Sequence, residues 1–124
     1  MSFNFIVTDQ NITINMAMLQ ELVQDNTAAV KPFIELFLTN VPPEIDKLLL
    51  LNQKNDWENL AKTAHHIKSS LSVIQVDDMY LMAQMIEQKA KLKQESETIK
   101  VLLEIMQQKV KTAQFILQKQ LALL

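Results

Sequence analysis

The sequence has 124 residues, which suits a single domain over residues 1–124 that is long enough to bury a core. It contains no cysteine, which excludes disulfide scaffolds, thiolate metal sites and cysteine nucleophiles. The formal net charge of −2 leaves no basic surplus to neutralise phosphates, so we expect no binding to nucleic acid.

Glycine is absent, and sheets with tight hairpins usually need glycine at positive φ. The common residues are good helix formers such as Leu, Ala, Gln, Lys, Glu and Met. Both features predict an all-α fold. The apolar runs are too short to cross a bilayer, and the first residues do not resemble a signal peptide. We therefore expect a cytoplasmic protein without membrane association, and the initial Met and compact length favour a free-standing protein.

Residues 1–13 are expected to be extended or irregular, as an N-terminal segment before the first helix. A short helix over 15–24 follows, because its apolar residues have helical spacing. A second helical pattern begins near Thr27 and is interrupted by Pro42 and Pro43. Proline removes a backbone donor and clashes with the preceding turn, so this pattern is either one kinked helix or two helices.

A third helix is expected from Trp57 to Ile74, after a capping signal at Asn55 and Asp56. Asp77 is suited to cap a fourth, Met-rich helix, and Ser96 to cap a long final helix that ends near Leu121. Short connections make neighbouring helices antiparallel. The pattern therefore predicts an antiparallel up-down four-helix bundle with a short additional N-terminal helix.

The stretch AKTAHHIKSS, residues 61–70, contains both histidines of the chain. If the core face of this helix is centred on Ala64, His65 lies about 100° and His66 about 160° from that centre. His66 should then face open solvent. His65 should border the core face with its ring accessible and with Lys68 one turn away.

Most chemistries of histidine are excluded by the surrounding sequence. Adjacent histidines diverge on a helix, and no HExxH or cysteine pattern is present to bind zinc. No nucleophile elbow supports a serine hydrolase, and no P-loop supports a kinase. A neutral imidazole is, however, a competent nucleophile near neutral pH, and a nearby lysine can offset the charge of a phosphoryl group. The other reading of these residues is an ordinary solvated helix face.

The motif AHHIKSS resembles the A-H-x-L-K-G-S core of histidine phosphotransfer (HPt) domains. The longer stretch NDWENLAKTAHHIKSS is similar to the family pattern G-D-W-x-x-L-x-x-x-A-H-x-L-K-G-S, and FIELFLTNVPPEIDKL is similar to the preceding family helix. The resemblance covers roughly residues 15–121. It implies that His65 is the phospho-acceptor and that Lys68 stabilises the phosphate, while Ser69 replaces the family glycine and could crowd the ring or donate a hydrogen bond.

The resemblance implies a phosphorelay intermediate in two-component signalling, without intrinsic kinase or hydrolase activity. His65 would accept a phosphoryl group from a receiver-domain aspartate and pass it to another receiver, with Lys62 and Ser69 as further supports. The implied partners are response-regulator receiver domains of a hybrid histidine kinase and of a downstream regulator. They would dock on the second and third helices. No intrinsic cofactor or metal is expected, and Mg²⁺ would be bound by the receiver.

The other ring nitrogen of His65 would be oriented from the second helix, by Thr39 or Asn40. Two alternatives to the phosphorelay remain. One is a non-catalytic helical adaptor that binds receiver domains or other partners without carrying phosphate. The other is a bundle that dimerises through its leucine-rich C-terminal helix.

Overall fold

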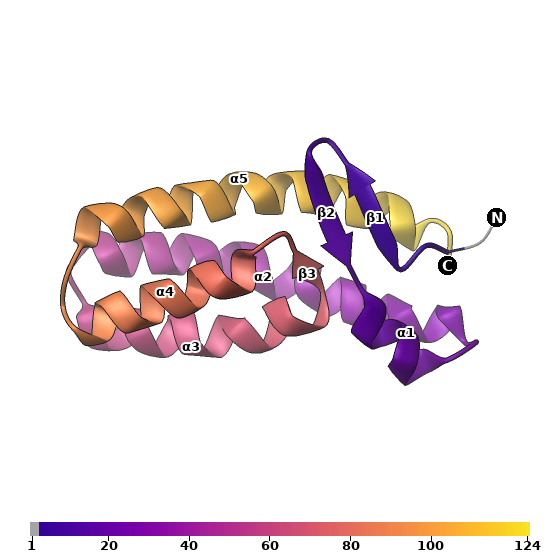
Figure 1. The fold of residues 1–124 in the computed structure, drawn as a ribbon, viewed down its shortest axis with the longest axis horizontal. Coiled ribbons are helices and arrows are strands. Elements are labelled where there is room, and N and C mark those ends of the chain that lie inside the picture. The colour runs from indigo at the N-terminus through magenta and orange to yellow at the C-terminus, as the bar shows by residue number, and fades with distance from the viewer. Residues whose placement is uncertain (1–2) are drawn as a thin grey trace.

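The computed structural model describes residues 3–124 and has four long helices in a bundle, with a short helix at one end (Figure 1). The helical elements are α1 (Ala17–Val23), the 3-10 turn η1 (Thr27–Val30), α2 (Lys31–Gln53), α3 (Trp57–Val73), α4 (Met79–Lys91) and α5 (Ser96–Leu121). Helix α3 packs between α2 and α4, and α5 packs mainly against α2. The all-α class and the four-helix bundle with a short N-terminal helix are confirmed.

Helix α2 runs unbroken through Pro42 and Pro43, so the single-helix alternative is correct. Its buried stripe continues across the prolines, with Val41 before them and Ile45 and Leu48 after them. Packing of this stripe against the bundle maintains the helix where two backbone donors are missing.

Two of the expected helix caps are displaced by one residue. The side chain of Asp56 caps α3 by accepting a hydrogen bond from the Asn59 amide, as expected. Asp78 rather than Asp77 precedes α4, and Glu95 rather than Ser96 precedes α5. Asp77 has instead a positive φ of 46° and connects two parts of the fold, as described below.

Residues 1–13 were expected to be extended or irregular, and most of their described part is extended and paired in a sheet rather than irregular. Two strands, β1 (Ile6–Asp9) and β2 (Ile12–Asn15), form an antiparallel hairpin, and β2 also pairs with the short strand β3 (Gln75–Val76). The turn between β1 and β2 consists of Gln10 and Asn11, with φ of 50° and 67°. Such a hairpin turn usually contains glycine, but asparagine also tolerates this conformation. The absence of glycine therefore did not exclude a hairpin.

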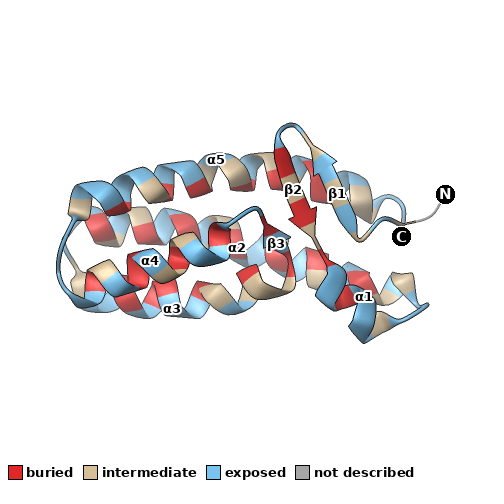
Figure 2. Cartoon of the chain, in the orientation of Figure 1, coloured by how far each residue is buried: buried red, intermediate tan, exposed pale blue. Residues whose placement is uncertain are grey.

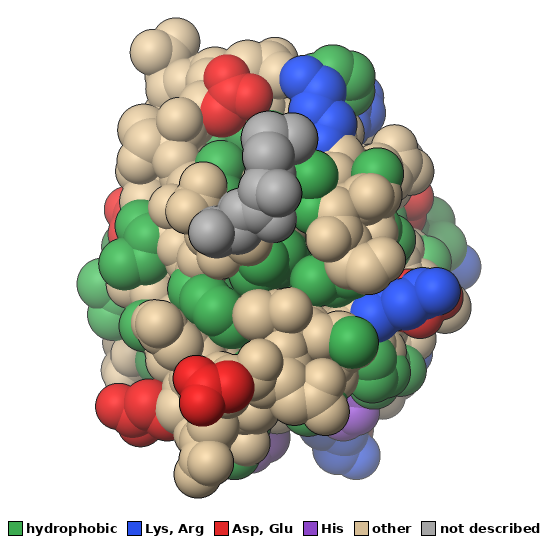
Figure 3. Space-filling model, turned by 90° about the vertical axis from the view of Figure 1, so that its right-hand side faces the viewer, with side chains coloured by type: hydrophobic (Ala, Val, Ile, Leu, Met, Phe, Trp, Pro, Cys, Tyr) green, Lys and Arg blue, Asp and Glu red, His purple; other side chains and the backbone are tan. Residues whose placement is uncertain are grey.

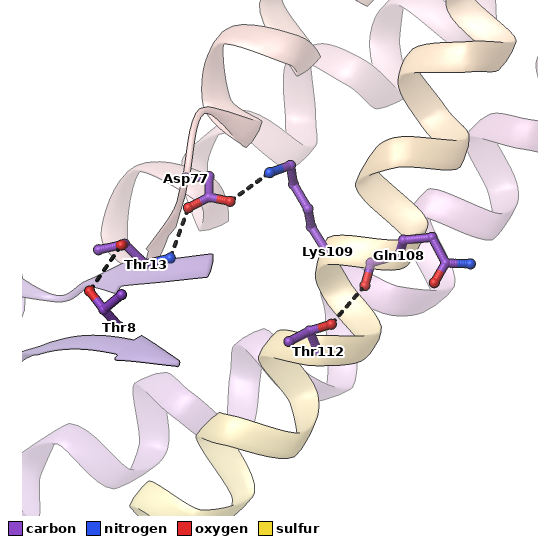
Figure 4. A network of polar contacts seen from close by, with 6 residues as sticks. All are labelled: Thr8, Thr13, Asp77, Gln108, Lys109 and Thr112. Carbon is purple, nitrogen blue, oxygen red and sulfur yellow. Dashed lines mark hydrogen bonds and ion pairs between the residues drawn. The ribbon is translucent and has the colours of Figure 1, made fainter. Parts of the chain in front are cut away.

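Asp77 connects the hairpin to the bundle (Figure 4). One of its carboxylate oxygens accepts a hydrogen bond from the Thr13 amide at 2.8 Å, and the other forms an ion pair with Lys109 of α5. The Asp77 amide in turn donates to the Thr13 carbonyl. Burial opposes ionisation of Asp77, but the hydrogen bonds from Lys109 and Thr13 outweigh it and lower the pKa of this carboxyl.

One hydrophobic core includes side chains from the four long helices and from the sheet (Figure 2). The sheet contributes Ile12 and Ile14 from β2 and Val76 from β3. Hydrophobic side chains also appear on the surface of the end where both termini lie (Figure 3). Strand β1 and helix α1 lie towards this end (Figure 1), and they carry the exposed apolar residues Ile6, Met18 and Leu22. Within residues 3–124, no helix is both long and apolar enough to span a membrane.

The hairpin is expected to contribute to the free energy of unfolding of the whole chain. Ile14 is fully buried, so Ile14→Ala is expected to lower the free energy of unfolding by about 2–4 kcal/mol through lost burial and a cavity. Ile6→Ala is the matched control, because Ile6 is 58% exposed in the neighbouring strand. Urea unfolding of both variants measures the difference. Equal, small effects would show that the hairpin does not contribute to the cooperative core.

Candidate functional site

The two histidines lie on the exposed face of α3. Their side chains are 71% exposed for His65 and 77% exposed for His66. The buried residues of α3 extend further to both sides of Ala64 than expected, and with about 100° per residue each histidine lies about 130° from the centre of the buried face. The expected difference between a core-bordering His65 and a solvent-facing His66 is therefore not present.

The ring of His65 is held by a carboxylate of the neighbouring helix. Its Nδ1 lies 2.9 Å from Oε2 of Glu87 in α4, and the side chain of Glu87 is only 7% exposed. An ionised carboxylate can only accept hydrogen bonds, so Nδ1 of His65 carries the proton. The exposed Nε2 then has the free lone pair, as a nucleophile requires.

Glu87 also binds two lysines. Lys68 Nζ lies 2.7 Å from its Oε1, and Lys91 Nζ lies 3.1 Å from its Oε2. Burial alone would raise the pKa of Glu87, but the hydrogen bonds from Lys68, Lys91 and His65 outweigh it and lower the pKa from 4.5 to about 2. The same contact with Glu87 raises the pKa of Lys68. The site is thus an ionised, largely buried carboxylate that positions an imidazole and a lysine side by side.

The stabilisation from this carboxylate should depend on pH. The pKa of Glu87 is lower in the folded chain, so its contribution to stability is complete above its ordinary pKa of 4.5 and is lost as the pH falls towards 2. Urea unfolding over a series of pH values from about 6 to about 2 should show a steeper acid loss for the native chain than for Glu87→Gln. Parallel curves for the two chains would contradict this role of Glu87.

Lys62, expected as a further support for His65, is not part of the Glu87 cluster. It forms an exposed ion pair with Glu58 one turn away, with 3.3 Å between Nζ and Oε1. It lines the surface depression that also contains His66. The structure therefore brings Lys68 to His65 through Glu87 and brings Lys62 to the side of His66.

The hydroxyl of Ser69 points back to its own helix. Its Oγ donates to the backbone carbonyl of His66 at 3.1 Å. The hydroxyl group is thus occupied locally, and crowding of His65 by Ser69 is limited to the small side chain itself.

This orientation predicts a small effect of restoring the family glycine. Ser69→Gly should change the rate of phosphoryl transfer to His65 by less than about threefold, since no contact to the His65 ring is removed. It should lower the free energy of unfolding by about 0.5 kcal/mol, because glycine is a poor helix former. Transfer kinetics and urea unfolding test both statements. A large gain in rate would show instead that Ser69 obstructs the site.

The expected orientation of the His65 ring by Thr39 or Asn40 is not observed, because both residues are exposed on α2 and Glu87 of α4 has this role. A signal for Glu87 was present in the sequence. It lies on the otherwise apolar buried face of α4, one turn from Lys91. An acidic residue on a core face is costly unless it is paired, so it indicates a partner.

An apolar surface depression lies between α2 and α3. It is lined by Phe33, Leu36, Phe37, Ser69, Ser70, Val73 and Ile74. Phe37 is buried, Phe33 is partly buried and Leu36 is 57% exposed. This surface lies one to two turns from the histidines along α3. Another depression lies between α2 and the start of α5 and contains neither histidine.

Among residues 3–124, no group of three or more potential metal-binding side chains is assembled.

Comparison with known families gives a match to the model of the Hpt domain over residues 32–114. No curated protein and no solved structure matched the chain. The matched range covers more than half of the sequence and contains α3, Glu87 and the apolar depression. Domains of this family have a phosphotransfer role in two-component phosphorelays and interact with receiver domains. The chain belongs to the Hpt domain family.

Proposed function

We propose that the chain is a phosphorelay intermediate that accepts a phosphoryl group on Nε2 of His65 and passes it to a second receiver. The observation that carries this proposal is the exposed His65 ring with its Nδ1 bound to the buried carboxylate of Glu87. An adaptor that only binds its partners would not require this arrangement. The family match supports a phosphotransfer role.

The transfer is a displacement at phosphorus. The lone pair of His65 Nε2 attacks the phosphorus of an aspartyl phosphate on the first receiver. The N–P bond forms while the P–O bond to the aspartate breaks, and the bonding pair leaves with the aspartate carboxylate. The proton on Nδ1 stays in place, and Glu87 stabilises the positive charge that develops on the ring. The reverse displacement at the second receiver completes the relay.

Lys68 has the role of the phosphate-stabilising cation in this proposal. Its Nζ is bound to the same carboxylate as His65, and its side chain is 17% exposed. A phosphoryl group on His65 would compete with Glu87 for this ammonium group and would gain a charge-assisted hydrogen bond. Mg²⁺ would be bound by the acidic pocket of the receiver, where it neutralises the transferring group.

The docking surface in this proposal is the apolar depression between α2 and α3, with Leu36 as its most exposed apolar residue. A transient contact of moderate size is sufficient for transfer. The receivers would belong to a hybrid histidine kinase and to a downstream regulator in the cytoplasm.

The test is incubation with a receiver domain labelled at its aspartyl phosphate, followed by separation of the two proteins. The expected result is a label on this chain that is acid-labile and alkali-stable, as for a phosphoramidate bond, and that maps to His65. A receiver that binds the chain without transferring label would contradict the proposal and support the adaptor.

A further inference from the structure

We infer that His66 is a second phosphoryl-acceptor site, on the side of α3 that faces α2. This inference rests on the proposed function, because it requires that the chain accepts phosphoryl groups on imidazole. The site is formed by the ring of His66, by Glu44 of α2 and by the lysines Lys47 and Lys62.

The geometry of His66 repeats the geometry of His65. Its Nδ1 lies 2.9 Å from Oε1 of Glu44, the same distance as between His65 and Glu87. The ring is 77% exposed, slightly more than that of His65, and Glu44 is 22% exposed. The carboxylate of Glu44 accepts a hydrogen bond from Nδ1–H, so the exposed Nε2 of His66 also has a free lone pair. Both partner residues come from helices adjacent to α3, one on each side.

Cations are available to a phosphoryl group on His66. The ring shares a surface depression with Glu44, Lys47, Asn59, Lys62 and Thr63. The ion pair of Lys62 with Glu58 is exposed on both sides, so it is weak and leaves Lys62 able to reorient. Lys68, by contrast, is bound to the buried Glu87. The charges around His66 are thus less organised, and transfer to it should be slower than to His65.

The depression that contains His66 and the apolar depression are separate, but both lie between α2 and α3. Phe33 and Phe37 line the apolar depression, and Glu44 and Lys47 lie further along the same helix. Ser69 and Ser70, which also line the apolar depression, lie one turn after His66 on α3. A receiver that covers both depressions would also cover His66.

The reaction at His66 balances in the same way as that at His65. Its Nε2 lone pair attacks the phosphorus of an acyl phosphate, the N–P bond forms, and the P–O bond breaks with its electron pair leaving on the carboxylate. The Nδ1 proton stays with the ring and is bound to Glu44. The two rings diverge by about 100° around the helix, so one donor in one orientation can reach only one of them.

The test uses phosphoramidate, a small donor that releases ammonia and needs no docking surface. The native chain, His65→Gln, His66→Gln and the double variant are labelled and followed by ³¹P and histidine ¹⁵N NMR. The expected result is label on both histidines of the native chain, slower label on His66 alone in His65→Gln, and none in the double variant. No label in His65→Gln, with normal label on His65 in the native chain, would overturn the inference and leave the proposed function intact. Label on His66 without label on His65 in the native chain would support His66 as an acceptor and contradict the proposed role of His65.

Replacement of Glu44 tests whether the His66 ring is positioned by this carboxylate or is merely an exposed histidine. In the His65→Gln background, Glu44→Ala should slow labelling of His66 by at least about threefold and shift the ring away from the tautomer with the proton on Nδ1. Glu35→Ala is the matched control, because Glu35 is an exposed acid on the same helix. Equal labelling rates and unchanged ¹⁵N shifts in Glu44→Ala would show only the reactivity of any surface histidine and would overturn the inference.

Discussion

Replacement of His65 by glutamine is expected to lower the rate of transfer from a phosphorylated receiver by about a hundredfold, since the nucleophile itself is removed. Glutamine has no lone pair on nitrogen with comparable nucleophilicity, but it retains a side-chain amide that can donate to Glu87. The fold should therefore remain intact, because His65 is 71% exposed and contributes little to the core. The measurement is the initial rate of label transfer, with thermal unfolding as the check on the fold.

His66→Gln is the matched control for this prediction. The two residues are adjacent in α3, have similar exposure and each bind one carboxylate. His66→Gln should keep the receiver-driven rate within about threefold of the native chain, because His65, Glu87 and Lys68 are unchanged. A native rate in His65→Gln together with loss of transfer in His66→Gln would assign the main acceptor to His66.

The sequence was sufficient to predict the helices because their signals are local. The final helix was expected to follow a cap at Ser96 and to end near Leu121, and α5 begins one residue earlier than this and ends at Leu121. His65 and Lys68 are one turn apart on α3, so their proximity also follows from helical spacing. Contacts between residues of the same helix could thus be predicted from the sequence alone.

The contacts of the two histidines with carboxylates could not be predicted in this way. Glu87 and Glu44 are each 22 residues away from their histidine in the sequence, and on different helices. Which side chains meet across two helices depends on the rotation of each helix about its axis, and apolar spacing fixes that rotation only approximately. Thr39 and Asn40 were predicted to orient the His65 ring from α2. In the structure α2 provides the partner of His66, whereas the partner of His65 comes from α4, on the other side of α3.

The hairpin was missed for a different reason. Its strands are four residues each, and its turn places Gln10 and Asn11 at positive φ. Composition argued against such a turn because glycine is absent. The hairpin also precedes residue 32, where the match to the Hpt model begins, so the family pattern gave no information about it.

Replacement of Glu87 by alanine is expected to lower the rate of transfer to His65 by about tenfold, as the loss of an orienting partner does at comparable sites. It should also lower the free energy of unfolding, because Lys68, Lys91 and His65 lose the carboxylate that they share. Lys68 is the residue left without its carboxylate, and its side chain is only 17% exposed. Urea unfolding and transfer kinetics measure the two effects separately.

Two comparisons separate positioning of the ring from general loss of stability. Glu87→Gln keeps an oxygen that can accept a hydrogen bond from Nδ1–H of His65, so it should recover part of the transfer rate while the charge partner of Lys68 remains absent. Glu104→Ala, an exposed acid on α5, should change neither quantity. A native transfer rate in Glu87→Ala would mean that the orientation of His65 is not limiting, and that the carboxylate serves only to hold Lys68 and Lys91 against the bundle.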